Sequence, residues 1–211
     1  MQTQEALLEY KMDYSIEDFT KYKQYLNTID QVLARYFEEQ KEYIFCKKGC
    51  AHCCEIGQYP YSELEFRFLL LGFFRIPMQE QQEVIKRIKA IKEEYQNCED
   101  KKEYRYRCPF LSEDKVCTVY EYRGLICRTF GLLTITSQDK CVIPFCHSLG
   151  LNYSNVYDEK KKRIDFDKVE KDGYKIFPNA RKTNIKTLMS PEMFECEPLV
   201  FGDIKSMVEW L

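Results

Sequence analysis

The cysteines are the residues of this sequence with the clearest capacity for chemistry. There are 11 among 211 residues, and ten of the 11 lie between positions 46 and 146. Clustered thiols are typical of zinc and iron sites, because the deprotonated thiol is a strong ligand for both metals. An odd number of cysteines does not favour a disulfide framework. We therefore predict a metal centre whose candidate ligands are Cys46, Cys50, Cys53, Cys54, Cys108, Cys117, Cys127, Cys141 and Cys146.

The spacing within residues 46–54 suits ligands of a common ion. Three residues separate Cys46 from Cys50 and two separate Cys50 from Cys53, so one tight turn can present two sulfur atoms to one metal. Gly49 suits such a turn because it tolerates positive φ. In an extended segment Cys53 and Cys54 would point in opposite directions, so they would serve two metals or one of them would not be a ligand. Nine candidates leave room for one site or two.

Both histidines of the sequence stand beside cysteines: His52 precedes Cys53, and His147 follows Cys146. A neutral imidazole can replace a thiolate as a ligand or support one through a hydrogen bond. Ordinary loop positions explain both residues equally well, so the two interpretations stay open.

Positive side chains are expected near a thiolate site, because four thiolates around one divalent ion leave excess negative charge. Those that flank the cysteines are Lys47, Lys48, Arg107, Arg123 and Arg128. Cys196 instead lies between Glu195 and Glu197, where its thiol should hold its proton more firmly. We place Cys196 and the isolated Cys98 outside the site, the latter as a small buried hydrophobic residue.

Three long helices are predicted to position these residues. Apolar residues recur at alternating steps of three and four from Phe19 to Tyr36, which predicts a helix over residues 15–44 with Ser15 as its N-cap. A second helix begins with a capping box at Ser62 and is stopped by Pro77. A third is predicted over residues 78–96, with Val84 and Ile88 on its apolar face.

The cysteine-bearing half of the sequence lacks the helical spacing of apolar residues. Residues 108–146 alternate cysteines with glycine, proline and short apolar pieces, which predicts loops and a short strand pair near residues 131–136. Residues 201–211 favour a final short helix that carries Trp210. The expected fold class is mainly α, a helical scaffold with a loop-rich cysteine-cluster metal site and little strand. We expect one domain over residues 1–211, composed of an N-terminal helix (15–45), a cysteine-cluster region (46–146) and a C-terminal extension (147–211).

Composition excludes other classes of protein. The 32 Lys and Arg residues balance 34 Asp and Glu residues for a net charge of −2, whereas nucleic-acid binders carry a basic excess. The longest apolar run, residues 68–74, is far short of the roughly 18 residues that span a bilayer. The N-terminal residues lack the features of an export signal, so we expect a cytoplasmic protein. A metal ion is the expected partner, with no nucleic acid and no membrane, and the sequence identifies no protein partner.

Several runs of residues are together similar to a known family. They are Gly49-Cys50-Ala51-His52-Cys53-Cys54, Cys108-Pro109-Phe110-Leu111, the segment from Cys117 to Arg123, and Cys127-Arg128-Thr129-Phe130-Gly131. This pattern resembles the YkgJ-type cysteine-cluster family, with the signature CxxCxxCC, described as a zinc- or iron-chelating domain. The resemblance spans roughly residues 46–146 and implies metal binding by Cys50, Cys53, Cys54, Cys108, Cys117 and Cys127, with Tyr120, Arg123 and Arg128 as companions. The chain departs from the pattern in the extra residue after Cys46 and in Gly124, where the family commonly has proline.

Three functions are compatible with these residues. The first is a metal-binding protein that coordinates zinc or an iron–sulfur cluster through cysteine thiolates, in a structural or metal-handling role. The second is an iron–sulfur enzyme, since the cysteine pattern also resembles that of flagellin lysine N-methylases. The third is a thiol redox protein in which Cys50 and Cys53 form the reactive pair. No phosphate-binding loop, nucleophile elbow or His-Glu-x-x-His motif points elsewhere.

Overall fold

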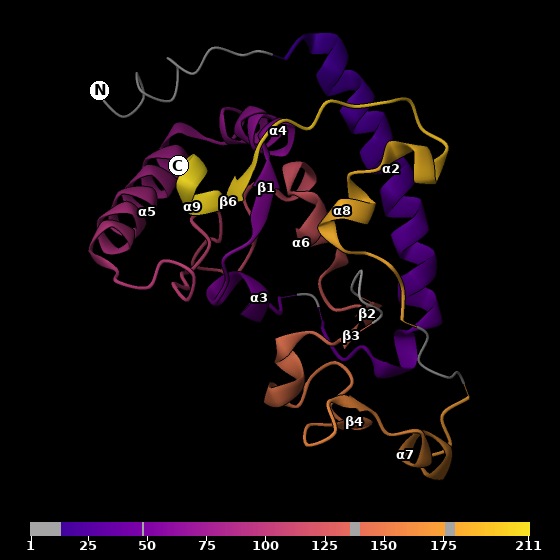
Figure 1. The fold of residues 1–211 in the computed structure, drawn as a ribbon. Helices are drawn as coiled ribbons and strands as arrows, with labels where there is room; N and C mark the ends of the chain where they lie inside the picture. Colours follow the sequence, from indigo (N-terminus) through magenta and orange to yellow (C-terminus); the bar gives the residue numbers. More distant parts are fainter. Residues whose placement is uncertain (1–13, 48, 136–139, 176–179) are drawn as a thin grey trace.

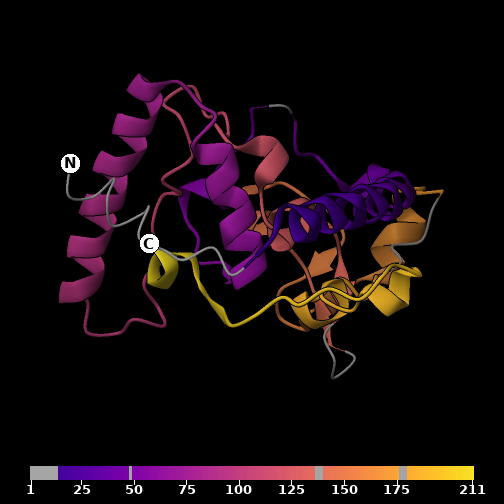
Figure 2. The same ribbon diagram turned by 90° about the horizontal axis from the view of Figure 1, so that it is seen from above.

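The computed structural model describes residues 14–47, 49–135, 140–175 and 180–211. Its longest elements are three helices, α2 (Ile16–Glu39), α4 (Glu63–Phe73) and α5 (Met78–Asn97) (Figure 1). Seen from above, α4 lies between α5 and α2 (Figure 2). Strand in the described residues is confined to three two-stranded antiparallel sheets. The predicted mainly α fold is confirmed.

Helix α2 begins as its sequence predicts. The Ser15 hydroxyl accepts from the Asp18 N–H at 3.1 Å, and the Asp18 carboxylate accepts from the Ser15 N–H at 2.8 Å, which completes a capping box. The predicted end at residue 44 is wrong, because α2 ends at Glu39 and a 3₁₀ turn, Lys41–Tyr43, follows. The buried Gln40 side chain causes this early end: its oxygen accepts from the Leu133 N–H at 2.8 Å and ties the chain to a distant loop.

Helix α4 is buried on two faces. Phe66 and Phe73 pack against Val84 and Ile88 of α5, whereas Leu64 and other apolar residues of α4 pack against α2. A helix between two others needs apolar residues nearly all round, which explains the uninterrupted apolar run in this segment. The predicted third helix is confirmed as α5, with its predicted apolar face buried.

The remaining elements are short. The helices are α3 (His52–Glu55), α6 (Leu125–Thr129), α7 (Phe166–Lys171), α8 (Ile185–Leu188) and α9 (Met207–Trp210), and the 3₁₀ turns beyond the first are Tyr120–Tyr122, Phe145–Leu149 and Pro191–Phe194. The strand pairs are β1 (Pro60–Ser62) with β6 (Ile204–Ser206), β2 (Thr134–Ile135) with β3 (Cys141–Val142), and β4 (Tyr157–Asp158) with β5 (Arg163–Ile164). The strand pair predicted near residues 131–136 is therefore present as β2 and β3, although Thr136 itself lies outside the described residues.

The C-terminal segment closes over the start of α4. Strand β6 pairs with β1 in a register that places Tyr61 opposite Lys205, and the Trp210 indole N–H donates to the Tyr61 carbonyl at 2.9 Å. The final helix predicted over residues 201–211 is thus shortened to α9, because residues 204–206 form a strand instead. The described helices offer no stretch of hydrophobic residues that could span a membrane.

Candidate metal centre

Five cysteines interact with one another, and we call them the inner thiol group. They are Cys53, Cys54, Cys108, Cys117 and Cys127. The Cys108 N–H donates to the Cys54 carbonyl at 2.7 Å, which fixes the second cysteine segment against the first. Helix α6 supplies Cys127 and lies beside β1, whereas α3 supplies the two adjacent cysteines (Figure 1).

Cys53 and Cys54 do not lie in an extended segment. Both belong to the single helical turn α3, and their sulfur atoms are 3.9 Å apart. The expectation that adjacent cysteines point in opposite directions is therefore wrong here, because successive side chains on a helix diverge by much less than on a strand. Both sulfur atoms are near enough to contribute to one centre.

A small cavity lies among three thiols of the inner thiol group. Cys54, Cys108 and Cys127 line it, and the other lining residues are Gly57, Tyr59, Tyr106 and Met207. It offers about 30 Å³ to the centre of a water-sized sphere, more than the roughly 10–15 Å³ that one bound water needs on that measure. The cavity therefore has room for a single ion.

The loop between Cys108 and Cys117 folds back on itself and brings these two residues together. Leu111 and Cys117 form an antiparallel bridge, and the Leu111 N–H donates to the Cys108 carbonyl at 3.0 Å. Each of the two thiols also accepts a hydrogen bond from the N–H two residues further along, which belongs to Phe110 for Cys108 and to Val119 for Cys117. Backbone N–H donors aimed at sulfur favour the thiolate and fix its direction.

Burial dominates the electrostatics of the inner thiol group. It raises the pKa of Cys108 well above the usual range, raises the pKa of Cys117, and raises the pKa of Cys127 to about 12. Negative charge at Cys54 raises the pKa values of the same three residues further. The pKa of Cys54 is itself raised, first by its hydrogen bond with Cys53 and then by burial. Several thiolates cannot share this space without a cation, and a divalent metal supplies the compensating charge.

Two tyrosines that the sequence did not single out support the inner thiol group. The Tyr61 hydroxyl lies 3.2 Å from the Cys127 Sγ, and the Tyr59 hydroxyl donates to the Cys53 carbonyl at 2.5 Å. Gly124 is the residue that allows this approach, since a Cβ there would lie 2.6 Å from the Tyr61 ring. The signal available in the sequence was the pair of tyrosines around Pro60, directly before the predicted capping box.

Three further cysteines form a second set, which we call the outer thiol group: Cys46, Cys50 and Cys146. The Cys46 thiol interacts with those of both Cys146 and Cys50, and the hydrogen bond with Cys146 lowers the pKa of Cys46 to about 6. Cys46 and Cys50 also line an open cavity of about 610 Å³ together with His52. Eight of the nine predicted ligands thus fall into two sets. Cys50 belongs with Cys46, whereas Cys53 belongs with Cys54.

The other cysteines lie apart from both sets. Cys141 packs in β3 against the hydrophobic cluster of Leu133 and Tyr153, and among the described residues no interaction joins it to another thiol. The Cys98 and Cys196 thiols each donate to a nearby backbone carbonyl at 3.4 Å. Cys141 remains a predicted ligand only.

Neither set is a finished coordination shell. Within residues 14–47, 49–135, 140–175 and 180–211, no three His, Cys, Asp or Glu side chains are arranged so that they could hold a metal ion as they stand. The donors have the chemistry that zinc and iron require, and the backbone brings their segments together.

The positive residues expected near the thiols have different roles. Arg128 is buried and bonds the Asp30 carboxylate of α2 at 2.6 Å and the Glu121 carbonyl at 2.9 Å, so it clamps the loop before α6 to α2. Arg123 stacks on the Tyr120 ring at 3.7 Å, and its charge partly offsets the rise in the pKa of Cys117 that burial causes. Lys47 lines the cavity of the outer thiol group, Arg107 pairs with Glu113, and Lys48 lies outside the described residues.

Comparison with known proteins gives one match. Residues 45–147 fit the CxxCxxCC family, described as a putative zinc- or iron-chelating domain. The match confirms the family resemblance, covers both thiol groups and supports metal binding by the chain. No curated protein and no solved structure was found to match.

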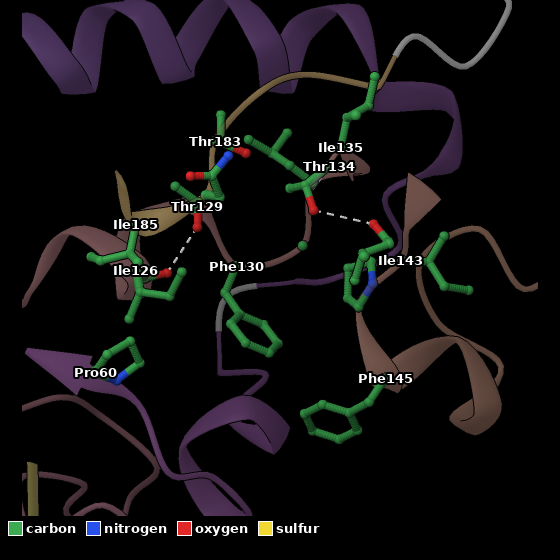
Figure 3. A pocket seen from close by; sticks show the side chains of 15 residues that line it. Pro60, Ile126, Thr129, Phe130, Thr134, Ile135, Ile143, Phe145, Thr183 and Ile185 are labelled. Carbon is green, nitrogen blue, oxygen red and sulfur yellow. Dashed lines mark hydrogen bonds between the residues drawn. The ribbon is translucent and has the colours of Figure 1, made fainter. Parts of the chain in front are cut away.

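An apolar pocket of about 330 Å³ is lined by Pro60, by residues between 126 and 145 and by residues 183–185 (Figure 3). Phe130 and Phe145 project into the same space, and Ile126 and Ile185 line it as well. The Thr129 and Thr134 hydroxyls donate to backbone carbonyls, shown as dashed lines in Figure 3. None of its 15 lining residues is charged and none is a histidine. The pocket therefore offers no acid–base group and no partner for an ionic ligand.

Proposed function

We propose that this protein holds one zinc or iron ion in the inner thiol group, and that the ion serves a structural or metal-handling role without catalysis of its own. The observation that carries the proposal is the cavity of about 30 Å³ lined by Cys54, Cys108 and Cys127. Tetrahedral thiolate sites suit both zinc and iron.

The lengths of the surrounding elements support a structural role. The inner cysteines lie in α3, which has 4 residues, in α6, which has 5, and in the irregular loop from residue 108 to 117. Isolated helices of that length are not stable in water. An ion bound by residues from all three segments would hold these segments together. Its binding energy would then contribute to the stability of the fold, as structural zinc does in small metal domains.

The test is metal content and fold together, measured on the full chain prepared without oxygen. We expect about one inner ion per chain, little colour beyond that of a single metal–thiolate centre, and loss of far-ultraviolet circular dichroism when a strong chelator removes the metal. The double variant C54S/C108S should lose this ion. The matched control C98S/C196S, which changes two thiols outside both groups, should keep it.

Three results would contradict the proposal. Brown protein with stoichiometric sulfide would favour the iron–sulfur enzyme. Metal-free protein that keeps its circular dichroism would remove the structural role. Equal metal content in C54S/C108S and C98S/C196S would show that the inner thiols are not ligands.

A further inference from the structure

The apolar pocket of Figure 3 is formed by segments that are far apart in the sequence. Pro60 comes from β1, Ile126 from α6, Phe145 from the 3₁₀ turn after β3, and Ile185 from the start of α8. Its volume of about 330 Å³ lies within the usual range of small-molecule sites, about 300–1,000 Å³. The pocket therefore has the size of a ligand site, and only the folded chain assembles it.

Hydrogen bonds on both edges of β2 hold the walls of the pocket. One edge pairs with β3, and on the other edge the Ile135 N–H donates to the Arg181 carbonyl at 2.9 Å. The Arg181 N–H donates in turn to the Leu133 carbonyl at 3.1 Å, and the Thr183 N–H donates to the Arg181 carbonyl at 3.0 Å. A site whose walls are fixed in this way needs little rearrangement to bind a ligand.

The Thr183 hydroxyl is a buried polar group with no hydrogen-bond partner in the described part of the chain. Thr183 lines the pocket and is only 2% exposed. The other two threonines of the lining differ, because the Thr129 hydroxyl donates to the Ile126 carbonyl at 3.0 Å and the Thr134 hydroxyl to the Val142 carbonyl at 3.3 Å. Buried hydroxyls almost always have a partner, since their desolvation without a hydrogen bond is costly. The Thr183 hydroxyl is therefore available to a group that enters the pocket.

Aromatic and branched aliphatic side chains form most of the remaining lining. In Figure 3 the Phe145 ring lies at the end of the pocket away from Thr183, and Phe130 lies between them. The two rings meet edge to face, with centroids 5.9 Å apart. Phe145 is 36% exposed and Val142, which also lines the pocket, is 45% exposed. These two residues leave apolar surface in contact with water, and a bound ligand would cover that surface.

We infer that the pocket binds a small neutral organic molecule, whose apolar body packs against Phe130 and Phe145 and whose single hydroxyl, carbonyl or amide group bonds the Thr183 hydroxyl. None of the described residues that line the pocket is charged, so a carboxylate, ammonium or phosphate group would lose its hydration without compensation. Both edges of β2 are paired, so an extended peptide cannot join this strand. The inference does not depend on the proposed function, because the described lining residues include no cysteine.

The test is the binding of four matched probes to the full chain, measured by saturation-transfer NMR and by titration. All four carry a phenyl ring on a propyl chain: phenylpropanol has a hydroxyl, propylbenzene has no polar group, and phenylpropanoate and phenylpropylamine are charged at neutral pH. We expect phenylpropanol to bind at millimolar concentration or below, and the two charged probes to bind at least about 10-fold more weakly. Absence of phenylpropanol binding, or equal binding of the charged probes, would overturn the inference.

Thr183→Val tests the hydrogen bond with little risk to the fold, because valine has the shape of threonine and the lost hydroxyl has no partner among the described residues. This variant should bind phenylpropanol about 3- to 10-fold more weakly than the wild type does, and propylbenzene at least as tightly. Thr187→Val is the matched control outside the pocket lining and should bind both probes as the wild type does. Unchanged phenylpropanol binding by Thr183→Val would overturn the role of Thr183.

Phe145→Ala tests the apolar part of the site. It should weaken the binding of phenylpropanol and propylbenzene by at least about 5-fold, because both probes lose contact with the ring. Phe74→Ala is the matched control, since Phe74 is 40% exposed, meets one aromatic neighbour at 5.3 Å and lies outside the pocket lining. Phenylpropanol that binds Phe145→Ala and Thr183→Val as tightly as the wild type would bind elsewhere, and the inference would be overturned.

Discussion

The hydroxyl of the buried Tyr61 lies 3.2 Å from the sulfur atom of the partly buried Cys127. Burial raises the pKa of Tyr61 well above the usual range, so the hydroxyl keeps its proton and can donate it to a thiolate. Hydrogen bonds of this kind to metal-bound sulfur strengthen the site and set its electronic properties. Tyr61 is thus placed to orient one ligand of the inner thiol group.

The substitution Tyr61→Phe should weaken metal binding by the inner thiol group by about 10- to 100-fold, because it removes that hydrogen bond while keeping the ring. Competition with a chelator of known affinity measures the change. Tyr104→Phe is the matched control, since its hydroxyl bonds the Ile91 carbonyl and the Glu94 carboxylate away from the thiols. A Tyr61→Phe protein that binds as tightly as Tyr104→Phe would show that the contact has no role in binding.

Gly124→Ala should weaken the same site through the same contact. The φ of Gly124 is −64°, which any residue adopts, so the cost comes from the clash of the new Cβ with the Tyr61 ring. Because both substitutions act on one hydrogen bond, Gly124→Ala should weaken binding much less in a Tyr61→Phe background than alone. Additive effects in this double-mutant cycle would contradict the coupling. Gly124, which departs from the family pattern, is thus in contact with Tyr61.

Arg128→Ala should lower the free energy of unfolding by about 2–4 kcal/mol, since it removes charged hydrogen bonds to Asp30 and to two carbonyls that hold the loop before α6. Urea denaturation of metal-loaded protein measures this loss. Arg105→Ala is the comparison at an exposed site and should change stability by no more than about 0.5 kcal/mol. Equal effects of the two substitutions would mean that Arg128 does not clamp the loop.

The capping boxes of α2 and α4 predict opposite pH behaviour. Burial raises the pKa of Glu65 above 4.5 in the folded protein, whereas hydrogen bonds to Ser15 lower the pKa of Asp18, which is exposed. A raised carboxyl pKa means that the folded state binds the proton more tightly than the unfolded state. The contribution of Glu65 to stability is therefore greatest below pH 4.5 and falls as the pH rises towards the folded pKa.

Urea unfolding at several pH values between about 4.5 and 7 tests this sign. The stability of the wild type minus that of Glu65→Gln should fall with increasing pH, and other titrating groups cancel in the difference. The corresponding difference for Asp18→Asn should stay flat, because a lowered pKa changes stability only at more acidic pH. A Glu65 difference that rises with pH would contradict a raised pKa.

The sequence carried enough local information for the helices. Ser15 with Asp18 and Ser62 with Glu65 are four-residue signals, and the apolar spacing in α2 and α5 is equally local. The pairing of β1 with β6 was not predictable in this way, because Tyr61 and Lys205 are far apart in the chain and each strand has only 3 residues.

For the candidate metal centre, too, local features were predictable from the sequence and long-range contacts were not. The thiol-rich segments were evident from the composition, and the family resemblance located most of the candidate ligands. The division into two groups depends on Asn152, a buried residue that no motif marks, and on the helical turn that turns Cys53 and Cys54 towards each other. Such long-range contacts are properties of the folded chain.

Anomalous diffraction at the metal absorption edge, on crystals of the metal-loaded full chain, tests the central claim most directly. We predict a metal peak in the cavity among Cys54, Cys108 and Cys127, with sulfur atoms at about 2.3 Å from a zinc ion. An occupied metal position elsewhere, with none of these three sulfur atoms within bonding distance of a metal, would contradict the account.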